Sequence, residues 1–540
     1  MTLDPDICFR AFESRDRRFE GRFVTAVVTT GIYCRPGCPA RMPRRRNLRF
    51  FVCGAAAEEA GFRPCLRCRP DSAPGTPAWG GTSASVSRAM RLIDEGALDH
   101  AGVDALAERL GVTARHVRRL FAEHVGASPL ALARTRRVHF ARRLIDETDL
   151  SFGEIALGSG FTNVRRFNHA VRETFRRTPG DLRRMRRASA APRPTERKRA
   201  ARSSAVSAGA ARDFAESVRG AVALSLRARR PFDGRAVLDF LGPRAVPGLE
   251  HVERGVYRRG IEIDGARGTV TVRPVLDGLE VAVKLPAPRD LIRVVSRVHR
   301  VFDFDADSSA ILSHLRRDPA LRRALEGRRD LRVPGAWDPF ELAVRAILGQ
   351  QISVRGAATI AGRLVQRLGA PLDRPEGAVT HVFPTAARVA NANLTTIGIP
   401  HSRAAALRAL ARAVADGSLA FERLGSLESA VERLTALPGI GEWTAHYIAM
   451  RALGEPDAFP AADLGLAHAL SDVDAREARL ASTGGKATPI ASAGARRTSR
   501  EHERASPGAV LARARAWQPW RAYAVIALWT GPKHPTRRKS

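Results

Sequence analysis

The stretch Leu437–Asp463, LPGIGEWTAHYIAMRALGEPDAFPAAD, predicts two helices joined by a tight turn and followed by an acidic residue. Pro438 ends the first helix, while Gly439 and Gly441 let the backbone turn and approach a neighbour closely. From Glu442 onward the helical period resumes. A glycine turn that opens a helix presents backbone N–H groups and a positive dipole end, which suits a phosphate. The letters L-P-G-I-G alone also fit an ordinary turn between packed helices.

Asp463 follows Trp443 by twenty residues, which leaves room for one helix and a returning loop. A glycine turn with such a downstream aspartate resembles the helix-hairpin-helix motif of DNA base-excision glycosylases. The resemblance implies that Gly439 and Gly441 bind DNA and that Asp463 is catalytic. Cleavage of an N-glycosidic bond builds positive charge on the sugar, and a nearby carboxylate stabilises that charge.

The chain is strongly basic along its whole length. Its 540 residues include 89 Lys and Arg against 55 Asp and Glu, a formal net charge of +34. Charge of this size predicts a polyanionic partner, and the length predicts several domains. No run of eighteen apolar residues occurs, and the N-terminus lacks the apolar segment of a signal peptide. We therefore expect a cytoplasmic protein that associates with the nucleoid.

All six cysteines lie within the first 68 residues. Four of them form two close pairs, C-x3-C and C-x2-C, separated by twenty-six residues. In a reducing compartment this spacing predicts a tetrahedral zinc site, with buried free thiols as the alternative. Cys8 and Cys53 fall outside the pairs and are predicted to be packing residues. The predicted ligands are Cys34, Cys38, Cys65 and Cys68.

The residues around the pairs, TTGIYCRPGCPAR (Thr29–Arg41) and GFRPCLRC (Gly61–Cys68), resemble the N-terminal domain of the Ada family of DNA-alkylation-response proteins. The resemblance implies that Cys34 also accepts a methyl group, once, from a methylphosphotriester in DNA. Zinc would hold its sulfur as the nucleophilic thiolate. Methylation would make the four-thiolate site less negative and so favour DNA binding. The residues implied to contact the phosphate are Thr30, Arg41 and Arg63, with solvated surface charge as the alternative for the arginines.

Residues 85–185 are strongly helical. Asp104–Pro129 and Ser151–Arg183 each predict a helix, a glycine turn and a helix, with a long helix near Leu130–Glu147 between them. Two such units resemble the AraC/XylS DNA-binding domain, whose recognition helices would begin at Thr113 and Asn163. An arginine side chain can recognise guanine in the major groove, and an asparagine side chain can recognise adenine. Each candidate side chain could equally contact only phosphate or water. The candidates are Arg115, His116, Arg118, Arg119, Asn163, Arg165, Arg166 and Asn168.

The remainder divides into two further regions after a basic, low-complexity linker at 186–212. Residues 213–325 contain alternating runs such as GVYRRGIEI (Gly255–Ile263) and loosely resemble the N-terminal domain of AlkA, the inducible 3-methyladenine glycosylase. Residues 326–533 match its helical domain more closely. A polar stretch at 471–505 predicts a disordered insertion close behind Asp463, where it could perturb the site.

The AlkA resemblance also implies a wedge residue and a base pocket. After A-I-L-G-Q, Gln351 takes the position of the side chain that fills the gap left in the DNA stack. AlkA is expected to have leucine there. The alternative interpretation of Gln351 is an ordinary turn residue at the start of a helix. An aromatic cleft would select cationic alkylated purines by stacking and cation–π attraction. Leu464 departs from the expected aromatic residue. The implied pocket residues are Trp443, Tyr447, Trp529 and Phe240, with core packing as the alternative.

The predicted fold is multidomain and mainly α. It comprises a small α/β zinc domain (1–75), an all-α double helix-turn-helix domain (85–185), an α+β (TBP-like) domain (213–325) and an all-α helix-hairpin-helix glycosylase domain (326–533). The resemblances imply a transcriptional activator switched by methyl transfer and fused to a DNA-3-methyladenine glycosylase of type II. We expect one zinc ion, double-stranded DNA and RNA polymerase as partners, and a monomer.

Two absences refine this interpretation. Strand-cutting relatives carry a lysine where this chain has Trp443, so a monofunctional glycosylase is implied; no cysteine follows Cys68, so no iron–sulfur cluster is expected. Two alternatives stay open. One is a transcription regulator with a degenerate glycosylase half, and the other is a glycosylase whose zinc domain only directs it to DNA.

Overall fold

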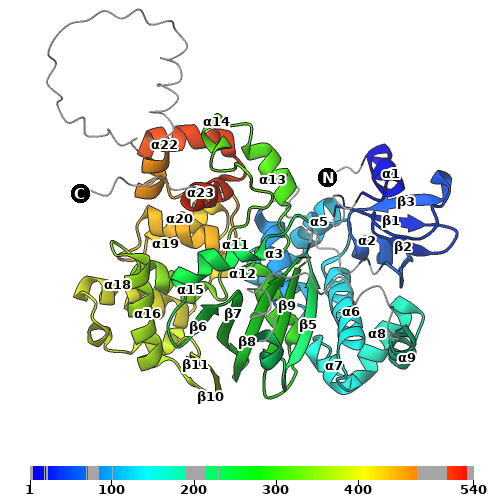
Figure 1. The fold of residues 1–540 in the computed structure, drawn as a ribbon, viewed down its shortest axis with the longest axis horizontal. Coiled ribbons are helices and arrows are strands. Elements are labelled where there is room, and N and C mark those ends of the chain that lie inside the picture. The colour runs from blue at the N-terminus through cyan, green and yellow to red at the C-terminus, as the bar shows by residue number, and fades with distance from the viewer. Residues whose placement is uncertain are drawn as a thin grey trace, which may run out of the picture.

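The computed structural model describes residues 4–531 apart from positions 17, 18, 20, 21, 69, 71–83, 100, 190–212, 229, 277 and 471–506. It confirms a multidomain, mainly helical protein (Figure 1). The insertion predicted at 471–505 lies outside the described residues. The linker predicted to begin at 186 begins later, because helix α9 continues to Ser189. Arg186 holds this helix end by donating to the carbonyl of Thr148 at 2.6 Å.

The zinc domain is a small sheet with two short helices. Its strand order is β3-β1-β2-β4, with β1 antiparallel to β2 and β3, and β2 parallel to β4. Strand β1 ends at Val27, and Gly31 takes a positive φ of 62° in the turn that follows. The elements are α1 (Pro5–Glu13), β1 (Val24–Val27), β2 (Ile32–Cys34), β3 (Leu48–Phe51), α2 (Gly54–Glu59) and β4 (Arg63–Pro64).

Two helix-turn-helix units share the long helix α6. Thr113 and Asn163 cap the two recognition helices, as predicted, and Gly111 turns the chain between the helices of the first unit with a φ of 69°. The zinc domain docks on α6, where Glu59 accepts from Ser128. The helices are α3 (Ala84–Asp94), α4 (Val103–Leu110), α5 (Ala114–His124), α6 (Pro129–Glu147), α7 (Phe152–Gly158), α8 (Val164–Phe175) and α9 (Pro179–Ser189).

The α+β domain is built on a five-stranded antiparallel sheet with the strand order β5-β9-β8-β7-β6. The alternating runs of the sequence form its central strands, whose inward side chains are buried. The elements are β5 (Val222–Arg227), α11 (Gly234–Leu241), β6 (Glu250–Glu253), β7 (Val256–Ile263), β8 (Ala266–Val275), β9 (Gly278–Lys284), α12 (Leu291–Val301), α13 (Ser308–Leu315) and α14 (Pro319–Arg322).

The glycosylase domain is helical apart from a small hairpin that lies against β7 and β8. Among the described residues no helix has the length and apolarity needed to cross a membrane. The elements are α15 (Pro339–Leu348), α16 (Val354–Leu368), β10 (Pro371–Glu376), β11 (Val379–His381), α17 (Ala386–Ala390), α18 (His401–Ala415), α19 (Leu427–Thr435), α20 (Glu442–Arg451), α22 (Pro507–Ala514) and α23 (Arg521–Thr530).

The second helix-turn-helix unit packs directly on the α+β domain. Leu144 of α6 and Leu291 of α12 belong to one continuous buried core, and both lie beside Gly158 of α7. At the edge of this contact, Glu147 accepts from the backbone N–H of Ser225 at 2.7 Å. The regulatory half, which we define as residues 4–189, is therefore fixed to the glycosylase half, which we define as residues 213–531.

A buried ion cluster joins the sheet to α15. Arg259, only 2% exposed, pairs with Glu250 at 3.1 Å and with Glu341 at 2.7 Å, and Arg345 pairs with both carboxylates at 2.9 Å. Each charge has lost its water, so its stability depends on its partners.

Removing one cation from this cluster is expected to be strongly destabilising. Arg259→Met should lower the free energy of unfolding of the glycosylase half by about 3–5 kcal/mol, because two buried carboxylates then share one arginine. Five of the six tryptophans lie at or beyond Trp337, so urea-induced loss of tryptophan fluorescence reports on this half. Arg267→Met, which breaks the half-exposed pair with Glu262, is the matched control and should cost less than about 1 kcal/mol. Equal midpoints for both variants would contradict the prediction.

Candidate functional sites

The four paired cysteines converge on one point. Strand β2 ends at Cys34, and the parallel strand β4 leads into Cys65 directly beside it. All four Sγ atoms lie within 4.8 Å of one another and are buried, an arrangement that fits a tetrahedral Zn²⁺ site. The backbone therefore builds a four-sulfur site from segments thirty residues apart. The converging ligands are Cys34, Cys38, Cys65 and Cys68.

The other two cysteines lie in different surroundings. Burial raises the pKa of Cys8 to about 11, and its side chain packs with Phe23. Cys53 donates its Sγ–H to the carbonyl of Val125 at 3.5 Å, at the contact with the first helix-turn-helix unit. Both belong to packed contacts rather than to the sulfur cluster. Around the cluster, Thr30 and Arg41 are exposed and Arg63 is half-buried.

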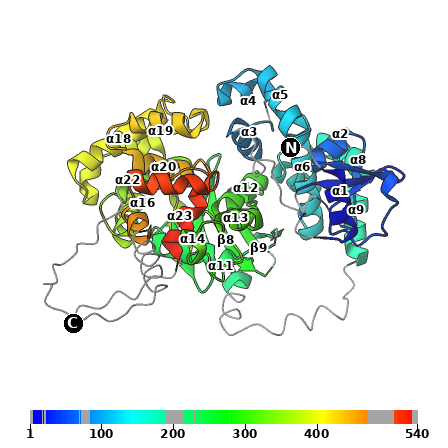
Figure 2. The ribbon, with the colours of Figure 1, turned by 90° about the horizontal axis from the view of Figure 1, so that it is seen from above.

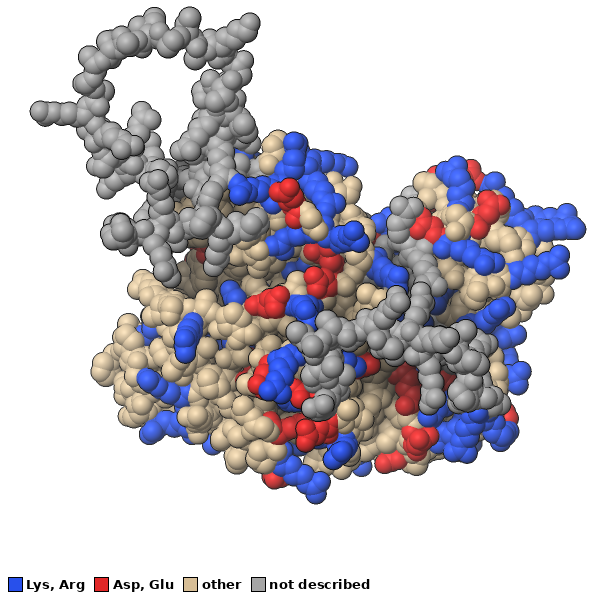
Figure 3. All heavy atoms as spheres, viewed as in Figure 1, with Lys and Arg blue, Asp and Glu red and all other residues tan. Residues whose placement is uncertain are grey.

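Both recognition helices present their polar faces to solvent. Arg115 and Arg118 on α5, and Arg165 and Arg166 on α8, are exposed. Asn163 has a local role as well, because its side-chain oxygen accepts from the N–H of Arg166 at 2.9 Å and caps α8. Figure 3 shows basic side chains over the whole visible face, with many at the edge formed by the zinc and helix-turn-helix domains.

The glycine hairpin lies between α19 and α20. Gly439 has a φ of 78°, and a Cβ there would come within 2.5 Å of the Ala406 side chain, so only glycine fits. Gly441 is the N-cap of α20 and makes no side-chain cap, so the first backbone N–H groups of that helix are available to an anion. The geometry suits a close approach by a phosphate.

The turn between α15 and α16 is fastened to this hairpin. Gln350 donates its amide to the carbonyl of Gly439 at 2.9 Å and to Thr444 Oγ1 at 3.0 Å. Arg403 donates to the carbonyl of Gln350 at 2.7 Å. The next residue, Gln351, is exposed and has a positive φ of 59°, an unusual conformation for a residue with a side chain. The turn therefore projects Gln351 outward beside the hairpin.

Asp463 is held by two indole groups. Its Oδ2 accepts from Trp443 Nε1 at 2.9 Å, and its Oδ1 accepts from Trp529 Nε1 at 3.0 Å and from the N–H of Leu466. Tyr447 stacks on Trp443 with ring centroids 5.2 Å apart and 8° between the planes, and its centroid lies 6.2 Å from that of Trp529. The structure thus brings one carboxylate and three aromatic rings together.

Two arginines lie behind this aromatic group. Arg451 donates to the Tyr447 hydroxyl at 2.6 Å, and its guanidinium lies 5.0 Å from the ring centroid of Phe240. Burial alone would raise the pKa of Tyr447, but Arg451 and Arg244 lower it overall. Phe240 is 4% exposed and carries Arg244 on its ring at 3.8 Å, so it lies deeper than the other three aromatics.

The sequence interpretation missed Gln350, Arg451 and Arg244. One local signal was available for Arg451, which follows Tyr447 by one helical turn and therefore shares its face. Gln350 gave no signal, because its partners are 89 and 94 residues away in the chain. Arg244 contacts Phe240 one turn earlier, but nothing in the sequence places that helix near Tyr447.

The two indole donors provide a test of how Asp463 is positioned. Trp529→Phe keeps an aromatic ring but removes one donor to Oδ1, so we expect the rate of base excision to fall about tenfold. Single-turnover excision from methylated duplex DNA measures this. Trp520→Phe, whose ring packs on Tyr523 at 5.9 Å, is the control and should retain the rate. An unchanged rate in Trp529→Phe would show that one indole suffices.

Comparisons with known families match four consecutive regions. They are the metal binding domain of Ada at residues 7–71, a helix-turn-helix domain at 106–185, the AlkA N-terminal domain at 223–338, and the HhH-GPD superfamily base excision DNA repair protein at 344–483. The four matches follow one another in the same order as the zinc domain, the helix-turn-helix units, the α+β domain and the glycosylase domain.

Three relatives are similar to all or part of this chain. A probable bifunctional transcriptional activator/DNA repair enzyme AlkA of Mycobacterium tuberculosis is 41% identical over 538 residues, covering 100% of this chain and 98% of its own. DNA-3-methyladenine glycosylase 2 of Escherichia coli is 31% identical and covers 55% of this chain and 94% of its own. The bifunctional transcriptional activator/DNA repair enzyme Ada of Escherichia coli is 34% identical over 34% of this chain and 49% of its own.

Proposed function

Because this chain belongs to the family of bifunctional transcriptional activator/DNA repair enzymes, we propose that it senses methylated DNA phosphates through Cys34 and excises alkylated bases at Asp463. The observation that supports the excision half is the Asp463 carboxylate held between two indole donors beside the glycine hairpin. The observation that supports the sensing half is the buried four-sulfur cluster at the N-terminus.

Excision is a hydrolysis at the sugar C1′. The C1′–N bond breaks with its electron pair leaving on the alkylated base, and positive charge develops on the sugar. Asp463 stabilises that charge while a water molecule adds to C1′ and loses a proton, which yields free base and an abasic site. Trp443 and Tyr447 offer aromatic faces to a flipped-out base such as 3-methyladenine. Trp443 has no amine, so the enzyme forms no Schiff base and leaves the strand intact.

Methyl transfer is a single displacement. The Cys34 sulfur forms a bond to the methyl carbon while the carbon–oxygen bond of the phosphotriester breaks, and an ordinary phosphodiester anion leaves. Zinc held by the four cysteines supplies one chemical advantage, the thiolate form of sulfur at neutral pH. We propose one zinc ion, with no iron–sulfur cluster elsewhere in the chain. The product thioether reduces the negative charge facing DNA, which favours binding through the exposed recognition helices.

Two further aspects of the proposal concern partners. The glycosylase domain implies double-stranded DNA as the substrate, and the helix-turn-helix domain implies double-stranded DNA as the operator. Association with the nucleoid follows from both. We propose that promoter-bound protein contacts RNA polymerase to activate transcription, and that the protein acts as a monomer. Sedimentation of the purified chain with and without a duplex tests the last point.

The experiment that tests the proposed function is base release. Purified protein is incubated with duplex DNA treated with a methylating agent, and free bases are identified by mass spectrometry. Release of 3-methyladenine is the expected result. If a folded, zinc-loaded protein releases no base, the excision half of the proposal is wrong and a regulator with an inactive glycosylase half replaces it.

A further inference from the structure

The helix-turn-helix domain contacts both outer ends of the helix-hairpin-helix unit formed by α19 and α20. At one end, Arg109 of α4 donates to Glu422 at 3.1 Å, in the turn that leads into α19. At the other end, Arg91 of α3 faces Glu455 at 3.8 Å, just after α20. Figure 2 shows α4 reaching the glycosylase helices from the side of the regulatory half. The unit that carries the hairpin is thus bordered at both ends by a DNA-binding domain.

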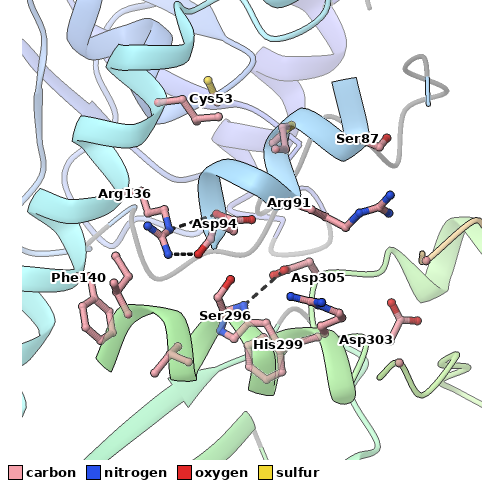
Figure 4. A pocket seen from close by; sticks show the side chains of 18 of the residues that line it. Cys53, Ser87, Arg91, Asp94, Arg136, Phe140, Ser296, His299, Asp303 and Asp305 are labelled. Carbon is pink, nitrogen blue, oxygen red and sulfur yellow. Dashed lines mark hydrogen bonds and ion pairs between the residues drawn. The ribbon is translucent and has the colours of Figure 1, made fainter. Parts of the chain in front are cut away.

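Between these contacts the interface is open. A cavity of about 440 Å³ separates α3 and α6 from α12 and the loop that follows it. In Figure 4, Arg91 and Asp94 lie on one side of the cavity, and Ser296, His299 and Asp305 lie on the other. Beside this cavity, the ion pair between Glu95, just after α3, and Arg300 of α12 joins the two helices.

A short series of contacts runs from that ion pair to the base pocket. Arg300 is the penultimate residue of α12, and the last residue of the helix, Val301, accepts through its carbonyl from the N–H of Gly335. A side chain at Gly335 would overlap the Arg300 backbone, so the two segments are in close contact.

On its other side, the segment Pro334–Gly335 is held by Arg451. The guanidinium of Arg451 donates to the carbonyl of Pro334 at 2.7 Å and to that of Gly335 at 3.4 Å. The N–H of Ala336 returns a hydrogen bond to the carbonyl of Arg451 at 2.9 Å. The same guanidinium donates to Tyr447, which stacks on Trp443, and Trp443 holds Asp463.

We propose that the regulatory half is part of the glycosylase, and that Glu95 is a positioning residue for base excision acting through Arg300, the Pro334–Gly335 segment and Arg451 on Tyr447. The inference rests on the proposed excision activity at Asp463. Excision depends on ring placement to within a fraction of an ångström, so loosening one end of this series lowers the rate without removing any group that touches the base. The same contacts would couple DNA binding by the helix-turn-helix domain to the rate of base excision.

The test uses the full chain. Glu95→Gln keeps the size of the side chain but removes the charge that holds Arg300, and we expect the single-turnover rate of 3-methyladenine excision to fall about three- to tenfold. Affinity for a duplex with an abasic analogue, zinc content and thermal midpoint should be unchanged, because the hairpin, the sulfur cluster and the cores are intact. Glu262→Gln is the matched control, since the Glu262 side chain is as exposed as that of Glu95 (33% against 32%) and forms an ion pair with Arg267 within the five-stranded sheet. Its excision rate should stay at the unmodified value.

Two further variants separate positioning from general damage. Glu95→Asp keeps the negative charge that faces Arg300, Arg297 and Arg109, so it should retain most of the rate. In a Tyr447→Phe background the hydroxyl that Arg451 holds is gone, so adding Glu95→Gln should have no further effect. Normal excision in Glu95→Gln, or an equal loss in Glu95→Asp, overturns the inference and leaves the proposed function standing. No excision by the unmodified chain overturns both.

Discussion

Asp463→Asn is expected to lower the rate of 3-methyladenine excision by about a thousandfold or more, the largest loss of any single substitution in the glycosylase half. The variant removes the negative charge that stabilises the developing cation on the sugar, which corresponds to about 4 kcal/mol of the barrier. It also turns one of the two carboxylate acceptors into an amide donor. One of the two indole N–H groups, on Trp443 or Trp529, then loses its acceptor.

The measurement is single-turnover release of base from methylated duplex DNA at saturating enzyme. Binding to an abasic analogue should persist, since Gly439, Gly441 and Gln351 are untouched. Asp373→Asn changes an exposed aspartate on β10 in the same way and should retain full activity. If Asp463→Asn released base at a rate near that of the unmodified protein, another group would have to stabilise the cation.

Cys34→Ser is expected to abolish methyl transfer from methylphosphotriester DNA altogether. A serine hydroxyl in place of the sulfur is neither a thiolate nor a strong zinc ligand, so zinc affinity should also fall by orders of magnitude. The measurement combines mass spectrometry of the intact protein, peptide mapping of the methyl group and zinc content. The unmodified chain should gain one methyl group, located on Cys34.

Two further variants distinguish the acceptor from the other cysteines. Cys38→Ser weakens the metal site but leaves the Cys34 sulfur in place, so transfer should slow with the loss of zinc. Cys53→Ser, in the packed contact with Val125, should keep both zinc and transfer. A methyl group mapped to a cysteine other than Cys34 would contradict the assignment.

Much of the fold could be predicted from local sequence patterns. Thr113 and Asn163 follow glycine turns and precede amphipathic runs, and both are N-caps in the structure. The alternation in Gly255–Ile263 predicted the strand that forms β7, and the cysteine spacing predicted the sulfur cluster. In each case the determining signal lies within a few residues of the element, or in a spacing typical of metal ligands.

Contacts between residues far apart in the chain could not be predicted from such local patterns. Gln350 contacts Gly439, and Glu95 contacts Arg300, across 89 and 205 positions, and no periodicity records those pairings. The end of α9 was also misplaced, because a basic, alanine-rich stretch reads as a linker until Arg186 is seen to bind the carbonyl of Thr148. Asp463 and its two tryptophans were identified separately, whereas the hydrogen bonds that join them came only from the fold.

The shared core between the second helix-turn-helix unit and the α+β domain bears on how this protein can be dissected. A truncated glycosylase beginning at residue 213 would uncover Leu291 and neighbouring apolar side chains, beside which α7 now lies at Gly158. Such a surface favours self-association in water. Activity measured on either half alone would therefore reflect aggregation as much as catalysis. Dividing the chain at its linker would require polar residues in place of the apolar ones at this interface.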